Sequence, residues 1–182
     1  MMSEPEKTDL MFKIALLGDP ATGKTSLINK YVHHAFDENY QPSLGVNIII
    51  KDIEVKEKNL KVKLILWDIA GQERYELSRR MFFQGCSGAL FVYDITRPST
   101  LESVESKWYP DLVTYGKKNS SFILIGNKTD LEDSRGITTE KGKELAETIQ
   151  ASDFIETSAK SGDNVEEAFS NLLTDVLSKI NK

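Results

Sequence analysis

Residues 18–25 read GDPATGKT. The run matches G-x-x-x-x-G-K-[ST], the pattern of a loop whose backbone amides surround phosphate groups. The apolar run at 11–18 predicts a buried strand before it, and 24–32 predicts a helix after it, which is the context that such a loop needs. We therefore expect nucleotide-binding groups on Asp19, Ala21, Thr22, Gly23, Lys24, Thr25 and Ser26.

Two side chains of this loop have predicted chemical roles. Lys24 is expected to bridge the β- and γ-phosphates as a catalytic residue, and the Thr25 hydroxyl is expected to ligate Mg²⁺. Pro20 has no backbone N–H. The donors should therefore come mainly from Ala21 through Thr25, so the proline is expected to be compatible with binding.

The rest of the chain alternates predicted strands and helices. Strands are expected at 48–56, 60–67, 88–95, 121–127 and 153–157, and helices at 75–85, from 99 to Pro110, at 138–150 and at 165–180. Ser99 and Glu102 have capping-box spacing, and Pro110 is expected to end or bend its helix. This order predicts an α/β fold with a doubly wound, mainly parallel sheet in one domain, 11–181, after a disordered tail, 1–10.

Composition excludes several classes of protein. The chain has 182 residues and a net charge of −5, which argues against a nucleic-acid binder that works by general electrostatics. Its one cysteine, Cys86, cannot form an intrachain disulfide, so the chain suits a reducing, cytoplasmic setting. We expect a monomer without a lipid anchor in the chain as given, and peripheral membrane association only if a longer natural C-terminus is prenylated.

Two further loops, each after an apolar run, complete a phosphate and base site. In WDIAGQE (67–73), Asp68 suits the Mg²⁺ shell, the Gly71 amide can approach a γ-phosphate, and Gln72 can orient the attacking water. In NKTD (127–130), Asp130 presents two acceptors that match guanine and not adenine. Asn127 is expected to tie this loop to the phosphate loop, and the stem of Lys128 to cover the base.

A fourth loop follows the last predicted strand. It reads TSAK (157–160), and we expect the Ala159 amide to donate to guanine O6 and Ser158 to support the loop that carries Asp130. Lys160 closes the same stretch and is included in the nucleotide site. Alone this short pattern has little weight, but it follows the other three loops in order.

With these four motifs, the chain resembles a small GTPase of the Ras superfamily over roughly residues 10 to 180. LILWDIAGQERY (64–75) and LFVYDIT (90–96) are most similar to the Rab branch. The resemblance implies a six-stranded sheet with one antiparallel edge strand, and a switch between GTP-bound and GDP-bound shapes. It also implies an exchange factor, a GTPase-activating protein and effectors that bind switch I and switch II.

Switch I of that family matches FDENYQPSLG (36–45). The resemblance puts Phe36 beside the guanine, Tyr40 over the phosphates and Ser43 on Mg²⁺ when GTP is bound. The family usually has threonine at position 43, and serine lacks the methyl group that stiffens χ1, so we expect weaker closing of this loop. The usual IGVDF reads LGVNI here, so Ile48 replaces an aromatic that normally joins Trp67 and Phe82 in an effector patch.

The sequence favours a slow GTP hydrolase that acts as a molecular switch, with no in-chain arginine evidently placed as a finger. Two alternatives stay open at this point. A GTP-binding interaction module with little useful hydrolysis is opposed by Gln72. A P-loop kinase is opposed by NKTD and by the lack of an arginine-rich lid. Pro20 is expected to face the space where Gln72 and a partner's arginine meet the γ-phosphate, and to crowd that arginine.

Overall fold

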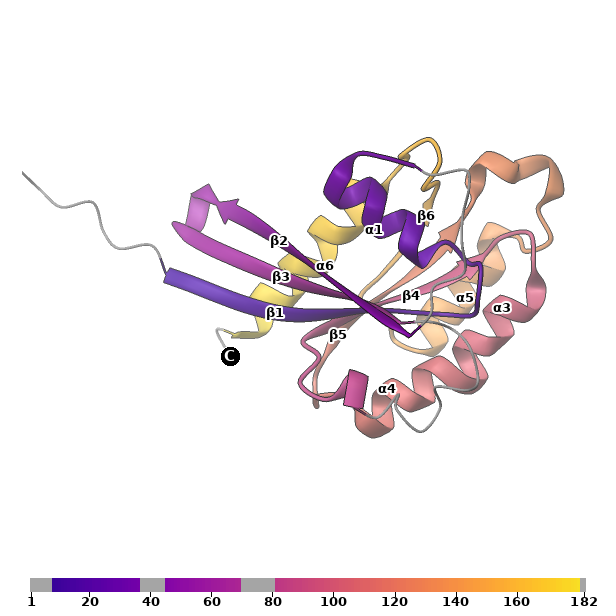
Figure 1. The fold of residues 1–182 in the computed structure, drawn as a ribbon. Helices are drawn as coiled ribbons and strands as arrows, with labels where there is room; N and C mark the ends of the chain where they lie inside the picture. The colour runs from indigo at the N-terminus through magenta and orange to yellow at the C-terminus, as the bar shows by residue number, and fades with distance from the viewer. Residues whose placement is uncertain (1–7, 37–44, 70–80, 181–182) are drawn as a thin grey trace, which may run out of the picture.

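The computed structural model describes residues 8–36, 45–69 and 81–180. They form a six-stranded sheet in the order β2-β3-β1-β4-β5-β6 (Figure 1). The strands are β1 (Thr8–Leu17), β2 (Val46–Val55), β3 (Leu60–Ile69), β4 (Gly88–Asp94), β5 (Ser121–Asn127) and β6 (Asp153–Thr157). The helices are α1 (Lys24–His33), α3 (Pro98–Ser103), α4 (Tyr109–Tyr115), α5 (Thr139–Thr148) and α6 (Val165–Ile180).

The pairing of the strands confirms the predicted fold class. β1 pairs in parallel with β3 and β4, and β5 lies in parallel between β4 and β6. β2 pairs antiparallel with β3 at the edge of the sheet. A 3₁₀ turn, Lys56–Lys58, joins these two strands, and Asn59 follows it with φ of 50°. β2 and β3 therefore form a hairpin, because a short turn can join antiparallel neighbours only.

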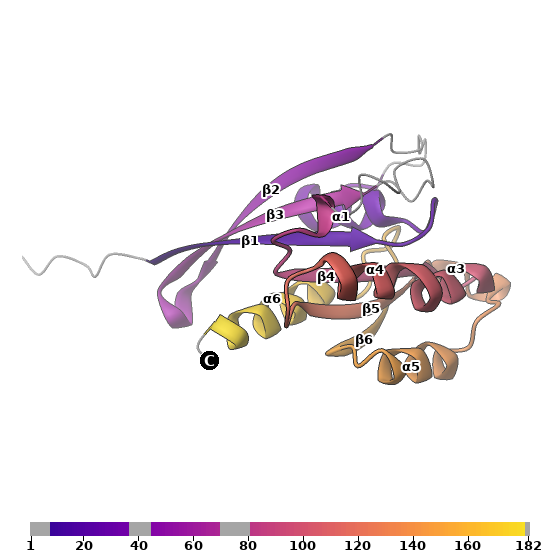
Figure 2. The ribbon, with the colours of Figure 1, turned by 90° about the horizontal axis from the view of Figure 1, so that it is seen from below.

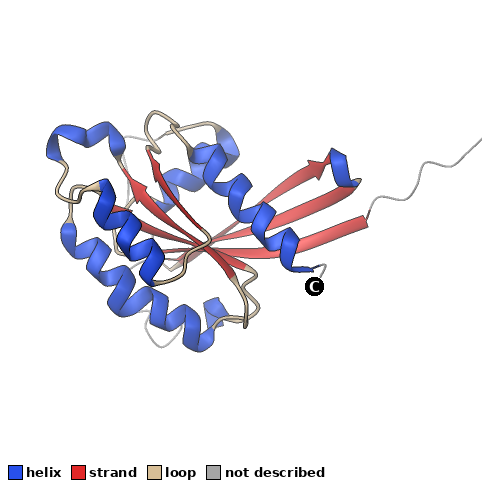
Figure 3. Ribbon diagram, turned by 180° about the vertical axis from the view of Figure 1, so that it is seen from behind, coloured by secondary structure: helices blue, strands red, loops and turns tan. Residues whose placement is uncertain are grey.

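Helices cover both faces of the sheet, so each face has its own apolar core. One core joins side chains of α1 and α6 to the sheet, with Tyr31 stacked on Phe169 at 3.9 Å between ring centroids. Viewed from behind, α6 crosses the strands (Figure 3). The other core joins the sheet to α4 and α5, which gather with α3 along the β4–β6 half (Figure 2). Central β4 is buried at every position, as expected for a parallel strand covered on both faces.

The predicted capping box at Ser99 and Glu102 is wrong. α3 begins one residue earlier, at Pro98, and its N-cap is Arg97, which makes no side-chain capping bond. Proline suits the first turn of a helix, because the amide it lacks would have no intrahelical partner there. The Thr100 hydroxyl instead donates to the Arg97 carbonyl at 2.7 Å.

Pro110 does not end its helix. A π-helical turn, Val104–Trp108, connects α3 to α4, and Pro110 lies in the first turn of α4. The Tyr109 amide donates to the carbonyl of Val104, five residues earlier. A proline ring clashes with the carbonyl four residues before it, and the wider π turn immediately upstream accommodates this ring with the chain still helical.

The described residues correct one smaller expectation, the disordered tail at 1–10. β1 begins at Thr8, where it pairs with Leu60, so 8–10 belong to the sheet and not to a tail. The predicted helix at 75–85 falls mostly outside the described residues.

Cys86 is fully buried, its Sγ donates to the Gly88 carbonyl at 2.9 Å, and burial raises its pKa to about 11. Within the described ranges, no helix combines the length and hydropathy needed to span a membrane.

Candidate functional site

The carboxyl ends of the parallel strands bring the predicted loops together. Leu16 of β1 is in register with Asp68 of β3, and Asp94 of β4 with Asn127 of β5. Asn127 is in turn in register with Thr157 of β6. Ligands of doubly wound sheets bind at this edge, so the topology alone brings the described parts of the four motifs to one site.

The phosphate loop depends on two glycines whose backbone comes close to its neighbours. Gly18 has φ of 150°, and a Cβ there would lie 2.1 Å from the Val92 carbonyl oxygen. Gly23 has φ of 100°, and its Cβ would lie 2.1 Å from Nδ2 of Asn127. The first backbone hydrogen bond of α1 runs from Leu27 to Gly23, so the amides of the preceding residues are not used inside the helix. The loop therefore presents backbone donors at a helix N-terminus, as predicted.

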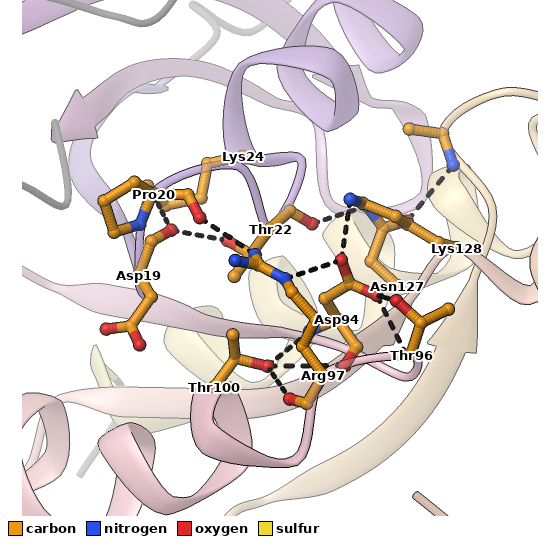
Figure 4. Close-up of polar contacts among 11 residues, drawn as sticks. Asp19, Pro20, Thr22, Lys24, Asp94, Thr96, Arg97, Thr100, Asn127 and Lys128 are labelled. Carbon is orange, nitrogen blue, oxygen red and sulfur yellow. Dashed lines mark hydrogen bonds and ion pairs between the residues drawn. The ribbon is translucent and has the colours of Figure 1, made fainter. Parts of the chain in front are cut away.

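Lys24 lies folded against this loop. Its Nζ donates to the carbonyls of Gly18 and Asp19, both at 2.8 Å, and the residue is 6% exposed. Lys24 and Asp19 lie close together beside Pro20 (Figure 4). Burial lowers the pKa of Lys24 to about 8; the carboxylates of Asp68 and Asp19 oppose this shift, and the guanidinium of Arg97 adds to it. A buried cation that is held, among the described residues, by two neutral carbonyl oxygens is suited to phosphate oxygens.

The predicted Mg²⁺ residues lie side by side. The Thr25 hydroxyl donates to Oδ2 of Asp68 at 2.5 Å, and Asp68 is buried at the end of β3. Among the described residues, no cluster of three or more His, Cys, Asp or Glu residues could hold a metal by itself. Mg²⁺ commonly takes one or two protein oxygens together with substrate phosphates and water, so this hydroxyl–carboxylate pair fits it.

Asn127 ties the base loop to the phosphate loop, as the sequence predicts. Its Nδ2 donates to the Thr22 carbonyl at 2.9 Å (Figure 4), while its Oδ1 accepts from the Thr157 hydroxyl at 3.1 Å. The amide of Ala159 also donates to this Oδ1, at 3.2 Å. That amide has a protein acceptor here, so its predicted bond to guanine O6 stays a prediction.

The other base-loop residues are held by their neighbours. The Ser158 hydroxyl donates to Oδ1 of Asp130 at 2.6 Å, which is the support predicted for this loop. Lys128 has a left-handed φ of 78°, and its Nζ lies 2.7 Å from Oδ2 of Asp94. The Lys128 stem is thus anchored at its far end.

A cavity of about 440 Å³ lies between the phosphate and base loops. Its lining consists of Ala21, Gly23, Ser26, Phe36, Asn127, Lys128, Asp130, Leu131, Ala159 and Lys160. All but Leu131 belong to the predicted site, and Leu131 is the next residue after NKTD. Tyr40, Ser43, Gly71 and Gln72 lie outside the described residues, so the structure does not place these four predicted contributors.

Sequence reasoning missed two residues that contact the phosphate loop, and a third, Asp94, that holds one of them. Nη2 of Arg97 donates to the Pro20 carbonyl at 2.9 Å (Figure 4), and Nε1 of Trp108 donates to Oδ1 of Asp19 at 3.0 Å. Asp94 joins Arg97 to Lys128. For Asp94 and Arg97 the available signal was their position at and just after the end of a buried strand, which also lies at the ligand edge.

Comparison with known proteins agrees with this geometry. The family model described as "Ras family" matches residues 13–178. Ras-related protein RABA4a of Arabidopsis thaliana is 40% identical over 97% of this chain and 76% of its own length. Ras-related protein rab-11.1 of Caenorhabditis elegans is 38% identical over 99% of this chain and 83% of its own. The chain therefore belongs to the Ras family of small GTPases, and its relatives include Rab-named proteins.

Proposed function

We propose that this chain is a Rab-like molecular switch that binds GTP and GDP with Mg²⁺, hydrolyses GTP slowly, and acts in vesicle traffic or related signalling. One observation supports the proposal most directly. Asn127, which belongs to one base loop, contacts the phosphate loop at the Thr22 carbonyl and the other base loop at Thr157 and Ala159. A site that must bind a base and a phosphate chain at a set separation needs such a link.

The proposed division of roles follows the chemistry of each loop. The amides from Ala21 onward and the ammonium of Lys24 would bind the phosphates, and Thr25, Asp68 and Ser43 would hold Mg²⁺. When bound, Mg²⁺ neutralises charge on the phosphate oxygens. Lys24 and Gln72 would be the catalytic residues, with Gln72 orienting water toward the γ-phosphate.

Single-turnover GTP hydrolysis tests the proposed reaction. The unaltered chain should convert bound GTP to GDP slowly, and Gln72→Leu should slow that conversion further while leaving GTP affinity almost unchanged. Catalysis here is mostly positioning and charge stabilisation, so loss of the residue that positions water lowers the rate and not binding. Equal and negligible turnover in both proteins would support the alternative of a passive GTP-binding module.

Base selectivity is a separate test. The Asp130 carboxylate would accept from the N1–H and the N2 amino group of guanine. Asp130→Asn replaces one acceptor by a donor, so it should shift preference from guanine toward xanthine nucleotides, whose position 2 carries an oxygen. Ser158→Ala is the matched control for base preference. It removes the hydroxyl that supports Asp130 but leaves the carboxylate that would contact the base unchanged. Unchanged GTP affinity in Asp130→Asn would contradict the assignment.

The proposed partners are an exchange factor, a GTPase-activating protein and effectors that contact the switch regions. Ile48 is 50% exposed and in register with Trp67, and the ring of Trp67 lies 6.2 Å from that of Phe82. These three side chains would offer an apolar surface to such a partner, with Ile48 in place of the usual aromatic. We further propose a monomer with one nucleotide-binding domain up to residue 181, cytoplasmic or peripheral at a membrane, that does not bind nucleic acid.

A further inference from the structure

Arg97 contacts the phosphate loop at Pro20, the one residue of that loop without an amide hydrogen. This residue follows β4 and precedes α3, 77 positions from Pro20 in the sequence. Its Nη2 donates to the Pro20 carbonyl at 2.9 Å, and its Nε donates to Oδ2 of Asp94 at 3.1 Å (Figure 4). A guanidinium presents these donors in a fixed plane, so one side chain can bridge a carboxylate and a carbonyl.

Asp94 is a firm anchor for this bridge. Its side chain is 2% exposed and receives Nζ of Lys128 at 2.7 Å as well as the amide and hydroxyl of Thr96, at 2.9 and 2.7 Å. Burial would raise the pKa of Asp94, but the bonds from Lys128 and Thr96 outweigh it, and the pKa lies below its usual value. The carboxylate is thus charged at neutral pH. It connects Lys128 of the base loop to Arg97 at the phosphate loop.

The geometry of a peptide bond links the Pro20 carbonyl to the next amide. The described residues contain no cis peptide bond, and in a planar trans peptide the C=O and N–H point in opposite directions. Fixing the Pro20 carbonyl toward Arg97 therefore directs the Ala21 N–H away from Arg97. Ala21 lines the cavity between the phosphate and base loops, and no described residue accepts a hydrogen bond from its amide.

The backbone at this peptide needs an external support. Ala21 has φ of 59°, in the left-handed region that a residue with a Cβ adopts only at a cost. Proline at position 20 fixes φ there but leaves ψ free, and ψ is the torsion that turns this peptide. The local sequence alone therefore does not fix the direction of the Ala21 amide.

We propose that Arg97 is a positioning residue of the phosphate site: anchored by Asp94, it holds the Pro20 carbonyl so that the Ala21 amide points at the phosphates of a bound guanine nucleotide. The inference rests on the proposed nucleotide binding and assigns Arg97 no contact with the reacting atoms. Since Lys128 shares the same carboxylate, the orientation of this amide is linked to the base loop.

Two readouts test the proposal on the full chain, with fluorescent GDP as the probe. Arg97→Ala should speed release of labelled GDP by about tenfold, near the lower end for a hydrogen bond from a charged donor, because Arg97 is partly exposed. It should also shift the ³¹P resonance of a phosphate of bound GDP, which a purely structural role would not do in a protein of unchanged stability. Arg97→Lys should recover part of both effects, because a lysine keeps the positive charge but lacks the planar set of donors by which the guanidinium bridges the carboxylate and the carbonyl.

The control is Lys118→Ala, which removes an exposed cation from the segment between α4 and β5 and makes the same change in net charge. It should leave both readouts unchanged. Failure of the unaltered chain to bind GDP would overturn the proposed function together with this inference. Normal GDP binding with unchanged release and ³¹P spectrum in Arg97→Ala would overturn the inference alone. So would a large loss of GTP hydrolysis at unchanged GDP release, which would assign Arg97 a direct role at the γ-phosphate.

Discussion

The two halves of the nucleotide site are built in different ways. The phosphate loop presents backbone groups, and its shape comes from residues with positive φ: Gly18, Ala21 and Gly23. The base loops present side chains, and these are held by one another, as Asp130 is by Ser158 and Lys128 is by Asp94. The phosphate half should thus be sensitive to an added Cβ, and the base half to the loss of a polar group.

The largest expected effect is on the phosphate half. Gly23→Ala would put a Cβ 2.1 Å from Nδ2 of buried Asn127 at a φ of 100°. Either the loop or the link to Asn127 must move, so we expect loss of GDP binding and a drop of about 3 kcal/mol in the free energy of unfolding, measured by urea denaturation.

Gly85→Ala is the matched control for this clash. Gly85 also has a positive φ, 73°, but a Cβ there meets no described residue within 4 Å. Only backbone strain remains, at about 1 kcal/mol, and GDP binding should be normal. Equal losses of stability in the two variants would show that strain, and not the contact with Asn127, makes Gly23 necessary.

The link between the halves should be next in magnitude. Asn127→Ala leaves the Thr22 carbonyl, the Thr157 hydroxyl and the Ala159 amide without their shared partner in a buried setting. We expect the free energy of unfolding to fall by about 2–3 kcal/mol and GDP release to accelerate. Asn171→Ala, which removes a single bond to Asp153, should cost less than about 1 kcal/mol. Similar losses in both variants would contradict the linking role.

The pH dependence of GDP binding should report the protonation state of Lys24. Its pKa is lowered to about 8 by burial, and anionic phosphates favour its charged form. GDP affinity should therefore fall by about tenfold per pH unit above pH 8, until the ammonium of the complex also loses its proton. Lys24→Met should bind more weakly and lack this step, and any decline that it retains belongs to the N1–H of guanine.

The same group makes stability depend on pH in the absence of nucleotide. The unfolded chain keeps the Lys24 proton up to about pH 10.5, whereas the folded chain releases it near 8. In that window the unfolded state binds more protons, so the contribution of Lys24 to folding stability rises with pH. Urea denaturation of the unaltered chain and of Lys24→Met over this pH range isolates the contribution of Lys24 to the free energy of unfolding. An identical pH profile for both proteins would refute that contribution.

The smallest expected effect is at the far side of the phosphate loop. Trp108→Phe retains an aromatic ring in the core but removes the N–H that donates to Asp19. Asp19 is only half-buried, so water can replace the lost donor, and a double-mutant cycle with Asp19→Ala should give a coupling of about 0.5–1 kcal/mol. A coupling near zero would mean that this contact does not support the loop.

The predictions from sequence succeeded where the signal is local. Each buried strand is a short apolar run, and GDPATGKT and NKTD each follow one, so strand order and loop order could be read together. The errors lie in α3, where a proline in the first turn displaced the capping box, and at residues 8–10, which belong to β1 and not to a tail. At Pro110 a π turn kept the chain helical. Arg97 and Trp108 were missed because their partners are 77 and 89 positions away in the sequence. These residues become neighbours only through the order of the strands in the sheet.

Cys86 makes the protein convenient for spectroscopy. It is the sole cysteine, it is fully buried, and with a pKa of about 11 it carries almost no thiolate at neutral pH. Thiol-specific labels should therefore leave the native protein unmodified. A single cysteine introduced in switch I (36–45) can then carry a spin label or fluorophore as the only labelled site, without first replacing a core residue.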